Sequence, residues 1–325
     1  MKVVHFINKN VEYSGLANVA NNLNKEMQNI NEISSKLIDS SHKLSHGLSS
    51  FFSSSHIVVH GFFHKYFLLL FLARFFQKKS FYIVCHGQLT HNSLKRSKGL
   101  QMYMRFVKFV LGESVVAQYL NFKEHNDSIK YKKYFICGNG VNSNEHVHKK
   151  FNHPIKIFFI GRITYQKGLH LFLEKYEDLD LDIRNKFQLS IFGPVDSDYH
   201  EIKKFLNHKD FSECFKGPII GKDKIQAFKE NDIFLLPSIF EGEPIAFLEA
   251  TSHSKICLCT KHINTDINLS KDFTFFIEDG LSEILRKIIL LKDNDIQNMQ
   301  IASHSFSLKR SWKAITNKLI DVYKN

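Results

Sequence analysis

The chain reads Asp232-Ile-Phe-Leu-Leu-Pro-Ser-Ile-Phe-Glu-Gly-Glu-Pro-Ile-Ala-Phe-Leu-Glu-Ala250 across the stretch that decides the fold. The four apolar residues after Asp232 predict a short buried strand, which the Pro237-Ser238 step ends. Pro244 suits the first turn of a helix that opens just after Gly242. A buried strand followed at once by a helix is typical of a parallel α/β sheet.

Two glutamates eight positions apart, Glu241 and Glu249, lie in this stretch. We expect Glu241 on the strand-to-helix loop and Glu249 about one and a half turns into the helix, facing the same ligand, because each residue turns a helix by roughly 100°. A helix N-terminus presents free N–H groups and a partial positive charge that suit a phosphate, and carboxylates beside it suit sugar hydroxyls. A solvated helix face would also explain the spacing. The two signals together indicate a nucleotide sugar.

Length and composition predict two domains. The 325 residues exceed one ordinary core, and 43% hydrophobic residues with 31 Phe can fill two buried sheets. Helices alternate with strands, which favours parallel sheets. We expect strands at Val3–Ile7, Ile57–His60, Phe81–Cys85, Ser114–Ala117 and Lys133–Ile136 in the first half, and at Ile155–Ile160, Gln188–Phe192, Cys214–Phe215, Ile233–Leu236 and Ile256–Leu258 in the second, with a linker at 144–154.

Cysteines and histidines give no metal signal. The five cysteines lack a C-x-x-C pair, and Cys257 and Cys259 alternate on one face of a strand, as expected of a reduced pair in the core. Three histidines of the linker, His146, His148 and His153, have no acid or cysteine to complete a site. We therefore expect no metal and no cofactor.

The net charge of +12 lies in the first half of the chain. Residues 1–150 hold 20 Lys and Arg against 8 Asp and Glu, whereas residues 151–325 hold 24 of each kind. An anionic membrane, a polyanionic acceptor or a nucleic acid would suit such a half.

Residues 62–82 predict an interfacial helix, because they are rich in Phe and Leu and no acid occurs from 51 to 100. Basic side chains would meet anionic headgroups at about 1 kcal/mol each: Lys65, Arg74, Lys78 and Lys79, with Lys95 and Arg96 in a second patch. A buried crossover helix is the alternative. No apolar run is long enough to span a bilayer, and the N-terminus reads as a first strand rather than a signal peptide. We expect a cytoplasmic protein, peripheral on the inner face of the plasma membrane.

Other motifs follow predicted strands, where open parallel sheets bind ligands. Gly161 lets the backbone turn away from its strand, and Arg162 and Lys167 then place two cations at the sheet edge. Preorganised cations stabilise the negative charge that develops on a departing diphosphate, and they do so without a metal. Two unrelated surface cations are the bland alternative.

The stretch around Glu241 resembles the E-x7-E motif of retaining glycosyltransferases of family 4. It keeps Pro237, Ser238, Glu241, Gly242, Pro244, Glu249 and Ala250, and has Glu243 where the family most often has Phe. Gly161-Arg162 with Lys167-Gly168 matches the family's Gly-Arg and Lys-Gly element, and His86-Gly87 its His-Gly element. Gly15 stands in the Gly-Gly loop, whose first glycine is here Ser14, and Gly193 and Gly217 resemble glycines of loops around the nucleotide base.

This resemblance implies the glycosyltransferase B fold, which is two Rossmann-like, doubly wound α/β domains facing a central cleft. Residues 1–150 would bind the acceptor and residues 151–304 the donor, with a C-terminal helix at about 305–325 crossing back to the first domain. The implied catalytic residues are His86, Arg162, Lys167 and Glu241. Donor contacts would come from Gly15, Gly161, Gly193, Gly217, Gly242, Glu243, Pro244, Ile245, Ala246 and Glu249.

The resemblance also implies the reaction, a metal-independent transfer of a hexose or N-acetylhexosamine with retention. The donor would be a nucleotide diphosphate sugar, UDP before others, and the acceptor a hydroxyl of a lipid-linked oligosaccharide in bacterial surface polysaccharide assembly. A nucleotide-sugar epimerase or a phosphorylase on the same paired fold is an alternative. A nucleic-acid binder would explain the basic half but not the charged residues at successive strand ends, so we expect no nucleic acid partner.

Overall fold

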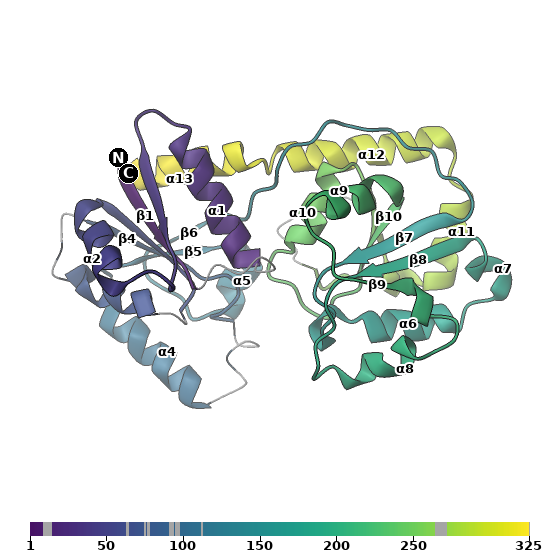
Figure 1. Cartoon of the computed structure of the whole chain (residues 1–325), viewed down its shortest axis with the longest axis horizontal. Helices are drawn as coiled ribbons and strands as arrows, with labels where there is room; N and C mark the ends of the chain where they lie inside the picture. Colours follow the sequence, from purple (N-terminus) through teal and green to yellow (C-terminus); the bar gives the residue numbers. More distant parts are fainter. Residues whose placement is uncertain are drawn as a thin grey trace. The chain divides into compact units, whose positions relative to one another are not determined.

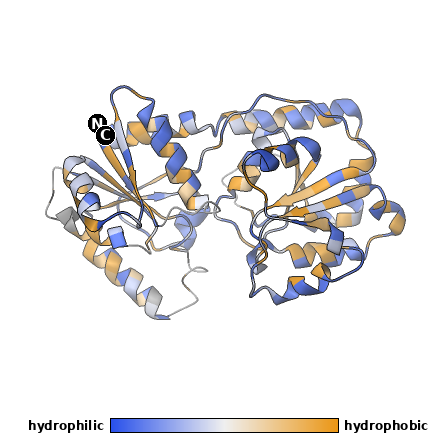
Figure 2. Ribbon diagram, viewed as in Figure 1, coloured by the Kyte–Doolittle hydropathy of each residue, from blue (hydrophilic) through white to orange (hydrophobic). Residues whose placement is uncertain are grey.

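The computed structural model describes residues 1–8, 15–62, 65–74, 76, 79–90, 94, 98–111, 113–263 and 272–324. The chain forms two compact units (Figure 1). Unit 1 joins Met1–Gly140 to Ser311–Asn325, and unit 2 comprises Val141–Arg310. Each unit has its own hydrophobic core around a parallel sheet, and Figure 2 shows the apolar strands at the centre of both.

Unit 1 contains a six-stranded sheet in the order β2-β1-β3-β4-β5-β6, with all pairs parallel. β1 lies between β2 and β3, so the chain leaves it in opposite directions and creates a switch point between β1 and β3. The strands are β1 (Lys2–Phe6), β2 (Ser34–Ile38), β3 (His56–His60), β4 (Ser80–Val84), β5 (Val116–Tyr119) and β6 (Tyr134–Ile136).

The helices of unit 1 pack on this sheet through apolar faces. α1 and the C-terminal helix α13 lie side by side, and α13 buries Trp312, Leu319 and Tyr323 (Figure 1). The predicted return of the last helix to the first domain is therefore confirmed. The helices are α1 (Gly15–Gln28), α2 (Leu44–Ser53), the 3-10 helix η1 (Lys65–Arg74), α4 (Lys98–Leu111), α5 (Phe122–Asp127) and α13 (Trp312–Lys324).

Unit 2 contains a second parallel six-stranded sheet in the order β12-β11-β10-β7-β8-β9. Its first strand, β7, is central, and its neighbour β10 begins the half that runs the other way. The switch point therefore lies between β7 and β10. The strands are β7 (Ile155–Ile160), β8 (Phe187–Phe192), β9 (Phe215–Gly217), β10 (Ile233–Leu236), β11 (Ile256–Cys259) and β12 (Thr274–Phe276).

Helices cover both faces of the second sheet. In Figure 1, α9, α10 and α12 lie on one side of it and α6 and α8 on the other. The helices are η2 (Tyr165–Lys167), α6 (Leu169–Glu177), α7 (Leu181–Arg184), η3 (His200–Ile202), α8 (Lys203–Leu206), η4 (Ser212–Cys214), α9 (Gly221–Glu230), α10 (Ile245–Ser252), η5 (Ile277–Asp279), α11 (Leu281–Ile289) and α12 (Asp293–Leu308).

The prediction of alternating strands and helices in parallel sheets is confirmed in both units. Two edge strands, β2 and β12, were not predicted, and β5 begins two residues later than expected. Edge strands are hard to recognise because one side of the strand lacks a partner and the hydrophobic pattern is short. Cys257 and Cys259 are buried free thiols within β11, as predicted.

The prediction of an interfacial helix over residues 62–82 is wrong. The segment forms the 3-10 helix η1 and then enters β4 at Ser80. Tyr66, Phe67 and Leu70 are buried in the core of unit 1, because a crossover between the parallel strands β3 and β4 must pack back onto the sheet. Most apolar residues that the structure describes in this segment thus fill the protein interior, as the crossover alternative predicted, whereas Leu68 is 61% exposed.

Two lysines of the predicted membrane patch bind backbone carbonyls instead. The Lys79 ammonium donates to the carbonyls of Phe51, Phe52 and Ser54, where α2 ends, and burial lowers its pKa. Lys65 donates to the His42 carbonyl at 2.6 Å. The side chain of Arg74, and all of Lys78, Lys95 and Arg96, lie outside the described residues. Within the part of the chain that is described, no helix is both long enough and apolar enough to cross a membrane.

Replacing Lys79 should therefore weaken folding. We expect Lys79→Gln to lower the free energy of unfolding by about 1–3 kcal/mol, because three carbonyls at the end of α2 lose a charged donor. Urea unfolding measures the change. Lys98→Gln, at an exposed position where α4 begins, is the control and should stay within about 0.5 kcal/mol of the parent. Equal stability of the two variants would contradict the anchoring role.

Candidate functional site

The loops that follow β7 and β10 lie against each other at the switch point of unit 2. Ile239 N donates to the Gln166 carbonyl at 2.9 Å, and Gln166 Nε2 donates to the Phe240 carbonyl at 2.9 Å. Gly168 has a φ of +63°, and a Cβ there would lie 2.2 Å from the Pro237 carbonyl oxygen. Only glycine fits this approach, so the two loops are held as one layer above the strand ends.

Lys167 and Glu241 meet across these two loops. Lys167 Nζ forms an ion pair with Glu241 Oε1, and Ser238 Oγ donates to the same oxygen at 2.7 Å. Glu241 and Ser238 are both buried. Thr260 Oγ1 in turn donates to the Ser238 carbonyl at 2.6 Å, which fixes the start of the loop. A buried carboxylate with a charged and a neutral donor is held in one orientation.

Three glycines predicted as donor contacts come together at the ends of β7, β8 and β9. Gly193 N donates to the Gly217 carbonyl at 2.9 Å, and Gly161 N donates to the Phe192 carbonyl at 3.0 Å. Gly193 has a φ of +147°, and a Cβ there would lie 1.8 Å from the Gly161 carbonyl oxygen. Arg162 follows Gly161 directly and is exposed. The second predicted cation thus stands at the same sheet edge as Lys167.

The helix α10 begins within the predicted motif, at Ile245, with Pro244 as the residue before it. Both Phe247 N and Leu248 N donate to the Pro244 carbonyl, so Pro244 closes the first turn. A Cβ on Gly242 would meet no atom within 4 Å, so the loop borders open space there. Ile245 and Ala246, which open α10, are half-buried, and the free N–H groups at a helix start suit an anion.

The other two glutamates of the motif also have cationic partners. Glu249 accepts from Lys224 of α9 at 2.7 Å, and both side chains remain partly exposed. The Glu243 side chain is buried and accepts from Arg310 at 3.0 Å. Arg310 is the last residue of unit 2, so Glu243 anchors the end of that unit. The sequence predicted that Glu243 contacts the sugar donor. In the structure its carboxylate forms the ion pair with Arg310.

His86 and Gly15 belong to unit 1. Gly15 opens α1, and His86 follows β4 with a φ of +47°, a conformation that side chains rarely adopt. The next amide, Gly87 N, donates to the carboxylate of Glu124, whose other oxygen accepts from Leu120 N at 2.6 Å. Burial raises the pKa of Glu124 to about 7 and lowers that of His86 to about 4. His86 is therefore a neutral imidazole near neutral pH.

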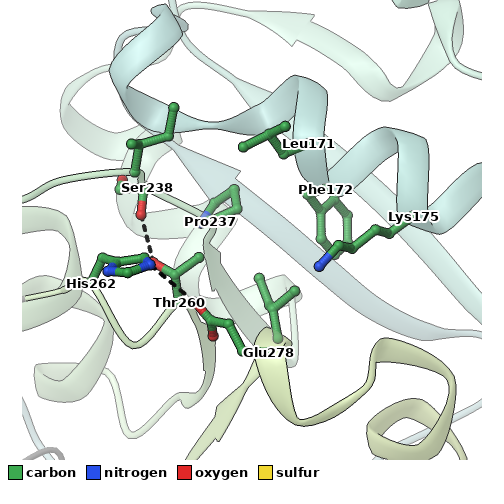
Figure 3. Close-up of a pocket in the computed structure, with 10 residues that line it drawn as sticks. Leu171, Phe172, Lys175, Pro237, Ser238, Thr260, His262 and Glu278 are labelled. Atoms are coloured by element: carbon green, nitrogen blue, oxygen red, sulfur yellow. Dashed lines mark hydrogen bonds and ion pairs between the residues drawn. The ribbon is translucent and has the colours of Figure 1, made fainter.

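A hollow of about 200 Å³, open to solvent, adjoins the Pro237-Ser238 step. Figure 3 shows Leu171, Phe172 and Lys175 of α6 on one side of it and Thr260, His262 and Glu278 on the other. His262 Nε2 and Glu278 Oε1 are 3.9 Å apart across its rim. The hollow shares this step with the loop that carries Glu241, but the predicted site residues that the structure describes do not line it.

Sequence reasoning missed the partners of the predicted residues. Lys224, Arg310 and Glu124 each bind a predicted residue or its neighbour from a separate element. Lys224 precedes Glu249 by 25 positions and Arg310 follows Glu243 by 67. No spacing rule links residues so far apart, and only the folded unit brings them together.

Comparison with known proteins places these features in context. The family model described as Glycosyl transferases group 1 matches residues 141–305. The chain is 26% identical over 218 residues to a glycogen synthase of Thermodesulfovibrio yellowstonii, covering 64% of this chain and 41% of that protein. It is 28% identical over 157 residues to the capsular polysaccharide biosynthesis glycosyltransferase CapH of Staphylococcus aureus, covering 45% and 42%. The chain thus spans about two fifths of the length of these relatives.

Solved structures share the fold along the whole chain. HepE of Anabaena, solved in complex with UDP, superposes with a TM-score of 0.74 at 11% identity and covers 100% of both chains. The lipopolysaccharide outer core galactosyltransferase WaaB, in its apo form, gives a TM-score of 0.64 at 14% identity and covers 100% of this chain and 99% of that one. The predicted glycosyltransferase B fold is therefore confirmed.

The strand-end glycines allow a matched test. We expect Gly193→Ala to destabilise unit 2 by about 3 kcal/mol or more, because the new methyl group would overlap the Gly161 carbonyl. Gly217→Ala is the control, since Gly217 also has a positive φ but a Cβ there meets no atom within 4 Å, so only backbone strain of about 1 kcal/mol applies. Thermal unfolding of both variants measures the difference, and equal losses would argue against the close contact.

Proposed function

The chain belongs to the group 1 glycosyl transferases, and from this membership we propose that it transfers a hexose or N-acetylhexosamine from a nucleotide diphosphate sugar to a hydroxyl group. The observation that carries the proposal is the pairing of Lys167 with Glu241 at the switch point of unit 2, with Arg162 at the same edge. Open parallel sheets bind their ligands at this position.

We assign each charged group a role that fits its position. Arg162 and Lys167 bind the diphosphate, and the N–H groups at the start of α10 add a partial positive charge. The Lys167 ammonium has three protons, so it can hold Glu241 and a phosphate oxygen together. Glu241 binds a sugar hydroxyl and Glu249 the ribose hydroxyls, while the ion pair with Lys224 holds Glu249 in place.

We propose transfer with retention and without a metal. The acceptor oxygen bonds to the anomeric carbon on the face that the diphosphate leaves, and the electron pair of the broken carbon–oxygen bond stays on the diphosphate. The acceptor proton passes to the departing phosphate oxygen, so no enzymic nucleophile is required. Arg162 and Lys167 supply positive charge where a metal would otherwise do so.

UDP is the proposed nucleotide and bacterial surface polysaccharide the proposed pathway. HepE, which shares the fold, was solved with UDP, and the name of the relative CapH refers to capsular polysaccharide biosynthesis. These facts concern those proteins and support the choice of donor and pathway here. The proposed acceptor is a lipid-linked oligosaccharide, which we propose the enzyme meets at the inner surface of the plasma membrane.

Helix α4 supports peripheral membrane binding in place of residues 62–82. Its outer face has four large side chains that are 44–80% exposed, namely Met102, Tyr103, Phe106 and Phe109, whereas Met104, Val107 and Leu111 are buried beneath it (Figure 2 shows the hydrophobic colouring along α4). Arg105 and Lys108 lie among these residues and border a hollow that Lys130 also lines. The sequence holds no Asp or Glu from residue 40 through 112. An apolar face with a basic border suits an anionic lipid surface.

Two other enzyme classes make different demands on the site. A phosphorylase would use inorganic phosphate as co-substrate, and an epimerase would act without an acceptor. A nucleic-acid binder would retain DNA at physiological salt. The match of residues 141–305 to a transferase family favours the transferase over all three.

A donor screen tests the function. UDP-, GDP-, ADP- and dTDP-sugars are compared by thermal shift and by slow donor hydrolysis, and the anomeric configuration of the product is read by NMR. We expect a UDP-sugar to stabilise the protein and release sugar, with Arg162→Ala or Lys167→Ala slowing turnover by about 10²-fold or more. Lys204→Ala, a surface lysine paired with Glu174, is the control.

Three results of this screen would count against the proposal. No response to any donor would contradict the transferase function. Normal rates in both cation variants would remove Arg162 and Lys167 from the mechanism. Activity that is lost in EDTA and restored by Mg²⁺ would contradict the metal-free reaction.

Membrane binding is tested separately. We expect the double variant Phe106→Ser/Phe109→Ser to bind phosphatidylglycerol vesicles about 10²-fold more weakly, because each Phe that becomes buried in the lipid contributes about 1.5–3 kcal/mol. Vesicle sedimentation measures the loss. Leu290→Ser, at a position that is 79% exposed in unit 2, is the control and should bind like the parent. Unchanged sedimentation of the Phe variant would rule out α4 as the docking surface.

A further inference from the structure

Three histidines form a continuous hydrogen-bonded chain across the switch point of unit 1. His5 Nδ1 lies 3.0 Å from His60 Nε2, and His60 Nδ1 lies 3.1 Å from His86 Nε2. At the far end, His5 Nε2 lies 3.4 Å from the sulfur of Met27. His5 lies on β1, His60 on β3 and His86 two residues beyond the end of β4, and these three strands are adjacent in one sheet. The chain of imidazoles therefore runs from the interior of unit 1 to the predicted site residue His86.

The histidine chain lies in the interior of unit 1, where neighbouring strands fix its members. His5 and His60 are fully buried, and β1, β3 and β4 are in parallel register on both sides of His60. His86 is held by its left-handed backbone and by the bond from Gly87 N to the buried Glu124. A non-glycine residue in that conformation costs about 1–3 kcal/mol, and such strain persists only where the surroundings enforce it.

Met27 sets the direction of every hydrogen bond in the chain. A thioether sulfur carries no hydrogen, so it can only accept, and His5 Nε2 must be the donor. A neutral imidazole has one N–H, so His5 Nδ1 is then an acceptor and must receive the proton of His60 Nε2. When His60 is neutral, the same rule makes its Nδ1 the acceptor of the proton on His86 Nε2. Burial lowers the pKa of both His5 and His86 to about 4, so the end members are neutral near pH 7.

We propose that His5 and His60 are positioning residues that hold His86 as the Nε2–H tautomer, so that its Nδ1 accepts a hydrogen bond from a hydroxyl group of the bound sugar. The proposal rests on the glycosyl transfer proposed above for the identity of the ligand. Its structural part, the tautomer of His86, does not depend on any substrate. Without these hydrogen bonds His86 would populate both tautomers. The Nδ1–H tautomer would present an N–H to the sugar hydroxyl instead of a lone pair.

The tautomers are measured first, on the full chain without ligand. Long-range proton–nitrogen NMR spectra of ¹⁵N-histidine-labelled protein distinguish protonated from bare ring nitrogens. We expect His5, His60 and His86 all to carry the proton on Nε2 at pH 7. His60→Leu, which removes both bonds, and Met27→Leu, which keeps volume but removes the accepting sulfur, should each give His86 a mixture of tautomers. His56→Gln, on the same strand but bound to the Tyr323 carbonyl, should leave His86 unchanged.

Kinetics then connect the tautomer to function. We expect His60→Leu to lower kcat about tenfold with little change in the KM for donor, the loss expected for one misdirected hydrogen bond. His60→Gln, whose amide can both donate and accept, should restore most of the rate and of the single tautomer. If His60 had only a structural role, His60→Leu and His60→Gln would lose stability alike and would have the same kcat. Thermal unfolding of both variants is therefore measured beside the assay.

Two results would overturn the proposal: an Nδ1–H proton on His86 in the parent protein, or a His86 that stays Nε2–H in His60→Leu. Unchanged kcat in a His60→Leu protein with mixed tautomers would overturn the catalytic part. If the spectra are as expected but no nucleotide sugar is turned over by the parent, the proposed function fails while the histidine chain is supported. The two failures are thus distinguishable.

Discussion

The candidate site depends on one constraint of the fold. In each sheet all strands run parallel, and the first strand of the unit has a neighbour on both sides. Parallel strands all end at one edge of the sheet, so the loops that follow them meet there. In unit 2 this brings the loop after β7 against the loop after β10, although 74 positions separate Lys167 from Glu241. In unit 1 the same arrangement places β1 beside β3 and β3 beside β4, which lets His5, His60 and His86 connect.

Much of this could be predicted from the sequence, because motifs at strand ends are local. Two runs of the sequence each predict a strand end, a turn and a helix start from their own residues. They are Gly161 to Gly168 and Pro237 to Glu249. The edge strand β2 was missed because Ser34-Ser-Lys-Leu-Ile38 lacks a continuous apolar run. Residues 62–82 were misread because periodicity cannot distinguish apolar residues that face lipid from those that face a core. Contacts between distant segments, such as Glu243 with Arg310, leave no local pattern.

Cationic side chains hold the three glutamates of the motif in place without a ligand. Glu241, Glu243 and Glu249 pair with Lys167, Arg310 and Lys224, which come from three different places in the chain. Glu241 and Glu243 are buried, and a buried carboxylate left without its partner is strongly destabilising, so their two pairs also hold the loops in place. The same residues thus contribute to the stability of unit 2 and to the geometry of the candidate site. Substituting any of them changes both, and stability must be measured beside activity.

The division of the chain has a consequence for how the protein folds during synthesis. Unit 2 is inserted between the two segments of unit 1, so all of Val141–Arg310 is translated before α13. Until α13 emerges, α1 lacks the helix beside it, and Tyr82 and His56 lack their contacts with Tyr323. The first-made segment of unit 1 therefore keeps an apolar face uncovered until all of unit 2 has been translated. Only the last segment of the chain can cover it.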